Sequence, residues 1–211
     1  MSSARPPKPL TTTSFAVLGL LAVRPHTAYE LARQVGRSLR WCWPRAEGRI
    51  YDEPKLLVAH GLAAAEVGAT GRRPKTTYRI TAAGRRALAR WLEEPTEAPP
   101  ELEYEALLKV SFAEHASKAA LARHLQTVLD QARANLAFGE SMAAIYLRGE
   151  APFPERVPMS VRLWTFLRTF HEGMAAWAEE SLAEIDSWPD DLAADPAMVE
   201  RALEILADRT P

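Results

Sequence analysis

The segment over residues 43–85 constrains the fold of this chain more than any other, because it places a helix directly before a hairpin. We expect the helix to run from Pro44 to His60, since proline suits the first position of a helix. Two short strands follow, and period-two alternation turns Tyr78 and Ile80 of the second strand toward the core. A helix followed by such a hairpin is the order of a winged helix-turn-helix.

The loop that joins the two strands is rich in glycine and in cations. Arg72, Arg73 and Lys75 crowd its tip, and Thr76 begins the strand after it. Three cations on one tip invite contact with phosphates and predict a strongly salt-dependent affinity. The helix can enter a major groove while this wing contacts the adjacent backbone, so the segment predicts a DNA-binding unit.

Four side chains of the expected helix are candidates for contact with DNA. Arg45 and Arg49 lie four residues apart, which puts them on one helical face. An arginine fork binds guanine O6 and N7 together, so this pair is predicted to contact base edges. Tyr51 and Lys55, near the edges of that face, are predicted to contact phosphates. The alternative is an ordinary solvated face whose cations pair with the neighbouring Glu47 and Glu53.

Two further helices are expected before this segment. Any residue of the run 11–14 could cap the first, which is apolar nearly all round and therefore buried. Thr27 and Glu30 have the spacing of a capping box and fix the start of the second. The tryptophans at 41 and 43 are predicted to pack the third helix against these two, with stacking on a ligand as the alternative.

The charge is divided sharply along the chain. The formal net charge of −1 conceals a balance of +9 over residues 1–95 and −10 over the remainder. We therefore expect a disordered lead-in over 1–13, a DNA-binding domain over 14–95, and a helical domain over 96–211 that dimerises. The predicted fold class is mainly α with a small β-hairpin: a winged helix-turn-helix followed by an all-α dimerisation domain.

The second half contains helices and little else. One is expected from Glu101 to Ala116, and Ser117 can cap a long one that reaches Gly149. Apolar residues recur along the long helix at spacings of four and three, a coiled-coil-like stripe that requires a partner helix. A last helix is expected with Asp195 as its cap and Pro196 at its first position. A protein that reads a two-fold operator needs a dimer, so the long helix and the aromatic helix that follows it are assigned to dimerisation.

Aromatic side chains gather on a helix that we expect from Met159 onward. Such a stripe is more often a core or a dimer interface than a ligand cage. The alternative is a pocket for a small aromatic effector, lined by Trp164, Phe170 or Trp177.

Two runs of residues resemble the PadR family of bacterial transcription regulators. They are Gly48-Arg49-Ile50-Tyr51, with Lys55, Leu57 and Gly61-Leu62 after it, and the stretch from Gly71 through Tyr78-Arg79-Ile80-Thr81 to Arg85. The resemblance implies a winged helix-turn-helix, a helical Vir-type domain that dimerises, and a repressor bound to inverted-repeat operators. It also implies release by a small aromatic or phenolic molecule.

Carried over by position, the family's DNA contacts fall on Arg49, Tyr51 and Lys55 and on the three wing cations named above. Pro54 departs from the family, in which many members have leucine there. A proline inside a helix removes a hydrogen bond and costs about 3 kcal/mol. Either the helix kinks, or a short helix ends near Tyr51 and another starts with Asp52 as its cap.

Catalysis, metal binding and membrane insertion have no support in the sequence. The five histidines form no pair at i, i+4, Cys42 is the only cysteine, and no nucleotide-binding loop or nucleophile elbow occurs. We therefore predict no catalytic residue, no metal and no cofactor. No run approaches the roughly 18 apolar residues of a membrane span, and the N-terminus lacks a signal-peptide core, so a cytoplasmic protein is expected.

A winged helix that contacts only proteins is the main rival. One fold serves both purposes, so the residues themselves leave this alternative open. Binding to a palindromic DNA fragment would separate the two.

Overall fold

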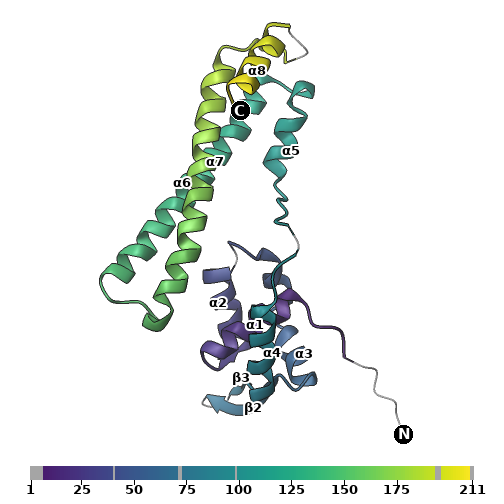
Figure 1. Cartoon of the computed structure of the whole chain (residues 1–211), viewed down its shortest axis with the longest axis vertical. Coiled ribbons are helices and arrows are strands. Elements are labelled where there is room, and N and C mark those ends of the chain that lie inside the picture. The colour runs from purple at the N-terminus through teal and green to yellow at the C-terminus, as the bar shows by residue number, and fades with distance from the viewer. Residues whose placement is uncertain (1–6, 40, 71–72, 98, 193–195, 210–211) are drawn as a thin grey trace. The chain divides into compact units, whose positions relative to one another are not determined.

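The computed structural model describes residues 7–39, 41–70, 73–97, 99–192 and 196–209. The chain divides into two compact units, Met1–Pro100 and Glu101–Pro211 (Figure 1). The first combines helices with a small antiparallel sheet, and helices make up the regular structure of the second. The predicted fold class, mainly α with a small β-hairpin, is confirmed.

Two capped helices open the first unit. Helix α1, Thr12–Val23, begins two residues before residue 14, the predicted start of the DNA-binding domain, and Thr11 is its cap. Helix α2, Ala28–Gln34, starts with the predicted capping box, in which the Thr27 hydroxyl accepts from the Glu30 N–H at 3.2 Å. The chain then continues through a π-helical turn, η1, over Val35–Leu39.

The single helix predicted over 44–60 is wrong. A 3-10 helix, η2, covers Pro44–Arg49, and a separate α-helix, α3, covers Glu53–Ala59. Pro54 falls in the first turn of α3, where its missing N–H needs no partner. Of the two alternatives, the break with Asp52 as the cap residue is therefore correct, although the Asp52 side chain makes no capping hydrogen bond.

This break also removes the predicted common face of Arg45 and Arg49. Both residues lie in η2. A 3-10 helix has about three residues per turn, so positions four apart are separated by about 120° around the axis. The argument that the two arginines form one base-reading pair therefore fails, and each has to be considered alone.

A three-stranded antiparallel sheet completes the first unit, in the order β1-β3-β2. Strands β2, Ala63–Thr70, and β3, Arg73–Ile80, form the hairpin, whose ladder extends into the region predicted as a loop. Tyr78 and Ile80 are buried as predicted. Sequence periodicity missed β1, His26–Thr27, because two residues are too few to show alternation.

The core of this unit lies between α1 and the elements that pack on it. Helix α4, Ala82–Glu93, is capped by Thr81, whose Oγ1 accepts from the Gly84 N–H at 3.0 Å. Helix α1 contacts α3, α4, η2 and β3. The largest fully buried side chains are contributed by α1, α2, α3 and the turn before α3: Leu18, Leu21, Leu31, Ile50 and Leu57. Three elements that carry candidate DNA contacts, η2, α3 and β3, thus all pack against α1.

Two long helices dominate the second unit and lie side by side (Figure 1). They are α6, Lys118–Leu147, and α7, Val157–Asp186. Ser117 caps α6 as predicted, and its hydroxyl accepts from the Ala120 N–H at 3.2 Å. The loop between them contains a 3-10 turn, η4, Pro154–Arg156.

Shorter helices flank this pair. The helix predicted over 101–116 is shorter, because α5 covers Glu105–Ser111 and a 3-10 turn, η3, covers Ala113–His115. Helix α8, Pro196–Arg209, begins at the predicted proline, and its predicted cap Asp195 lies outside the described residues.

The apolar stripe of α6 finds its partner helix within the same chain. Leu125, Val128 and Ala132 of α6 are buried, and Ala178 of α7 belongs to the same cluster as Val128. Farther along, a Cβ atom added at Gly139 would overlap the ring of Trp164, so the indole lies directly on the α6 backbone. Much of the stripe is therefore intramolecular core and not a surface free for a second copy.

Candidate nucleic-acid interface

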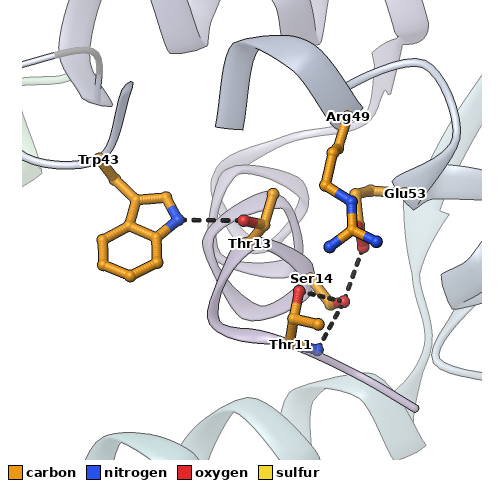
Figure 2. Close-up of polar contacts among 6 residues, drawn as sticks. All are labelled: Thr11, Thr13, Ser14, Trp43, Arg49 and Glu53. Carbon is orange, nitrogen blue, oxygen red and sulfur yellow. Dashed lines mark hydrogen bonds and ion pairs between the residues drawn. The ribbon is translucent and has the colours of Figure 1, made fainter. Parts of the chain in front are cut away.

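A buried polar network joins the candidate DNA-binding segment to α1 (Figure 2). The Ser14 hydroxyl donates to Glu53 Oε2 at 2.6 Å, and both side chains are buried. Glu53 Oε1 lies 3.9 Å from Arg49 Nε, the distance of an ion pair and not of a hydrogen bond. Glu53 is thus not the solvated partner that the sequence suggested.

A second contact fixes the start of η2. The indole N–H of Trp43 donates to Thr13 Oγ1 of α1 at 3.0 Å, as Figure 2 shows. Trp43 also packs on the core cluster that contains Val17 and Leu18. The predicted packing role is therefore correct for this tryptophan.

Three predicted contacts of this segment reach solvent. Side-chain exposure is 54% for Arg49 and 70% for Lys55, and Tyr51 is 57% exposed overall. Lys55 Nζ lies 3.6 Å from the exposed carboxylate of Asp52, a pair that water screens and that contributes little stability. All three side chains are accessible to a nucleic acid.

Lys75 of the wing is paired within the protein. Its Nζ lies 3.8 Å from Glu30 Oε1, while Glu30 Oε2 accepts from the Thr27 N–H at 2.7 Å. That backbone hydrogen bond is the main cause that holds the pKa of Glu30 below its usual value, and the Thr27 hydroxyl and the Lys75 charge add to it. A phosphate would compete with Glu30 for this lysine.

A surface hollow lies between the start of α2 and β3. Thr76, another predicted contact, lines it together with Lys75 and Glu30. Sequence reasoning missed two further lining residues, Tyr29 and Arg33, because both are on α2, outside the segment that carried the motif. Tyr29 is 65% exposed, so this edge offers a hydroxyl and two cations to a polyanion.

Three predicted arginines cannot be placed. All of Arg72, and the side chains of Arg45 and Arg73, lie outside the part that the structure describes.

Arg79, an exposed arginine of β3, has a partner in Glu66 of β2, with Nε 3.1 Å from Oε1.

The three residues proposed for an effector pocket occupy different surroundings. Trp164 lies on Gly139, and Trp177 packs on two core clusters of the second unit. Phe170 is 39% exposed and contacts the buried His171 edge to face. Trp164 and Trp177 are thirteen positions apart on α7, which corresponds to about 20 Å along the helix axis. The two indoles therefore do not line one small cavity within a single chain.

A different hollow of the second unit lies between α5 and α6. Its apolar walls include Leu108, Phe112 and Leu121, and its polar lining includes His124 and the Lys109–Glu105 ion pair. The sequence contains no signal for this hollow, because it forms only where α5 packs on α6.

Within the described ranges, no group of three or more His, Cys, Asp and Glu side chains is arranged to hold a metal ion. A search of the same residues for a helix long and apolar enough to span a bilayer also finds none.

The order of helices α1, α2 and α3, with the short strand β1 between the first two and the β2–β3 hairpin after the third, defines the first unit as a winged helix-turn-helix. Residues 17–90 match the sequence profile of the transcriptional regulator PadR-like family. This match falls within the first unit, where the sequence motifs predicted a likeness to the family. A probable transcriptional regulator of Mycobacterium tuberculosis, Rv1176c, is 35% identical over 81 residues, which span 38% of this chain and only 43% of that protein.

Solved structures extend the likeness in fold to most of the chain. PadR of Bacillus subtilis in complex with operator DNA superposes with a TM-score of 0.71 over 83% of this chain and 99% of that one, at 22% identity. The PadR-like regulator BC1756 of Bacillus cereus gives 0.68 over 84% and 98%, at 18% identity. At these identities the comparison establishes the fold alone.

Proposed function

We propose that this protein is a transcription regulator that binds a specific DNA sequence through its winged-helix unit. The observation that carries the proposal is the set of exposed cations on η2, α3 and the wing of a PadR-like unit: Arg49, Lys55 and Lys75. Arginine suits base edges and lysine suits phosphates, so the set supplies both parts of sequence recognition.

The functional form is proposed to be a homodimer on a pseudo-palindromic operator. The second unit supports this because, beside its intramolecular core, it leaves large apolar side chains exposed on α6 and α7: Phe138, Met142, Phe166 and Phe170. Apolar surface of this kind commonly marks an interface. A two-fold dimer would present two winged-helix units to two related half-sites.

Repression and release by a small aromatic molecule complete the proposal. PadR of Bacillus subtilis has been crystallised both with operator DNA and with p-coumaric acid. The apolar hollow between α5 and α6 offers a better site for such a molecule than the separated Trp164 and Trp177.

Selection of bound duplexes from a random DNA pool at about 150 mM salt tests the function. A pseudo-palindrome with half-sites about one helical turn apart is the expected result. A pool that stays random, with binding that disappears as salt rises, would overturn sequence-specific recognition. The winged helix would then be assigned to contact with a protein partner.

A further inference from the structure

Glu53 is the unusual residue of the proposed DNA-binding segment. A carboxylate beside a phosphate backbone repels it, and burying a charge is costly unless the group is paired. Glu53 is nevertheless only 3% exposed, in the first turn of α3 and next to the three exposed candidates for DNA contact. Core packing would be served as well by an apolar side chain, so a role for the carboxylate has to come from its two polar contacts.

The first contact anchors the carboxylate. Ser14 is fully buried in α1, where its Oγ accepts from the Thr11 N–H at 3.0 Å and donates to Glu53 Oε2 at 2.6 Å. A hydroxyl hydrogen bond to a charged acceptor is among the stronger kinds. The glutamate is therefore held by the N-terminal turn of the most deeply buried helix of the unit.

The second contact directs Arg49. Glu53 Oε1 faces the Nε side of the guanidinium at 3.9 Å (Figure 2). Arginine has five N–H groups, and an approach at Nε leaves the two terminal nitrogens for the two acceptors of a guanine. Because the side chain is 54% exposed, its unpaired form would sample many rotamers.

We propose that Glu53 is a positioning residue that sets the base specificity of this protein. Anchored by Ser14, it orients the Arg49 guanidinium for bidentate contact with a base and contributes little to affinity for DNA in general. This inference rests on the proposed function, because it requires an operator that Arg49 reads. A freely moving arginine would still attract phosphates, so the loss of Glu53 affects discrimination before it affects binding.

The test compares Glu53→Gln, Arg49→Ala and the double variant, each binding the selected operator and a random duplex. The measured quantity is the discrimination ratio, which is the dissociation constant for the random duplex divided by that for the operator. Glu53→Gln is expected to lower this ratio about tenfold through weaker operator binding, with the salt slope unchanged. In the Arg49→Ala background, Glu53→Gln should change the ratio less than about twofold.

Asp52→Asn is the matched control. It removes the same charge one position away, from a side chain that is 91% exposed, so it should change the binding of both duplexes alike. If Glu53→Gln unfolds at the assay temperature, Ser14→Ala replaces it, with an expected loss of about threefold in the ratio.

Two negative results remain distinct. If the wild-type protein does not discriminate between the duplexes, the proposed function fails and this inference fails with it. If the wild type discriminates but Glu53→Gln discriminates equally well, or lowers the ratio equally without Arg49, the positioning role alone is overturned.

Discussion

Charged side chains of the first unit fall into two groups: cations that are mostly exposed to solvent, and side chains that a partner within the protein holds more closely. Arg49 and Lys55 are exposed, whereas Glu53 is buried on Ser14 and Lys75 shares Glu30 with the capping box. A polyanion would meet the first group directly and would have to displace Glu30 from Lys75. We therefore expect these residues to have separable effects on specificity and on affinity.

Replacement of Arg49 and of Lys75 by alanine separates the two effects. Arg49→Ala removes a fork for base edges and should reduce operator binding by about 1–3 kcal/mol while relaxing specificity. Lys75→Ala should weaken binding to all sequences and flatten the salt slope by about one. Titrations of operator and random duplexes at several salt concentrations measure both. Arg168→Ala, an exposed arginine of α7, is the control and should change neither. Equal losses on both duplexes for Arg49→Ala would show that it reads no base.

The buried His26 predicts a dependence of stability on pH. Burial, assisted by the charge of Arg24 and opposed by Glu30, lowers the pKa of His26 below its usual value of about 6.5. The unfolded chain therefore takes up the proton first as pH falls. The contribution of neutral His26 to the free energy of unfolding is therefore fully present above pH 6.5 and is lost progressively as the pH falls below it.

Urea unfolding at pH 7.5 and 5.5 measures this dependence. The wild-type first unit should lose stability at the lower pH, and His26→Phe should lose less, since phenylalanine does not titrate. His115→Gln, at a histidine whose side chain is 79% exposed, should retain the wild-type difference. The same difference in all three proteins would contradict the role of His26.

At the scale of elements, helix ends and helix contacts have different origins. Thr27, Thr81 and Ser117 each cap a helix through a residue three positions away, so neighbours in sequence suffice to fix these starts. The break between η2 and α3 follows from Pro54 in the same local way. The pairing of α6 with α7 has no such local cause and depends on side chains far apart in the chain.

Gly139 and Gly173 form a matched pair that tests this helix contact. A Cβ at Gly139 overlaps the Trp164 ring, so Gly139→Ala should destabilise the second unit by about 1–3 kcal/mol. A Cβ added at Gly173, in α7, would meet no atom of another element within 4 Å among the described residues, so Gly173→Ala should stabilise the unit by about 0.5–1 kcal/mol. Thermal unfolding followed by circular dichroism compares the two. Equal shifts for both variants would mean that Trp164 does not lie on α6.

The whole molecule combines a basic unit with an acidic one. The net charge of −1 conceals this asymmetry. The basic half attracts a polyanion and the acidic half repels it, so a polyanion is directed to the first unit. The acidic half has its own core and exposes apolar residues beyond it. Its proposed task is to join two copies of the chain.

Phe166 tests the proposed dimer, since it is 67% exposed on α7. Light scattering should give the wild type about twice the chain mass of 23.4 kDa. Phe166→Glu should shift the protein toward the monomer, because a buried carboxylate opposes an apolar interface. Val67→Glu, at an 81% exposed apolar residue of the wing, is the control. A wild-type monomer, or a Phe166→Glu dimer as stable as the wild type, would contradict this interface.

The sequence by itself determined the helix caps, a disturbance of the third helix at Pro54, the inward face of the second hairpin strand and the likeness of the first unit to the PadR-like family. Each of these depends on residues only a few positions apart, or on motif spacing along the chain. The burial of Glu53 and the partner of the α6 stripe were decided by tertiary structure alone. Ser14 and Glu53 lie 39 positions apart, and nothing near Glu53 in sequence distinguishes it from a solvated glutamate. Tertiary packing gives chemically identical side chains different neighbours. Because those neighbours come from distant parts of the chain, the sequence around each side chain does not reveal them.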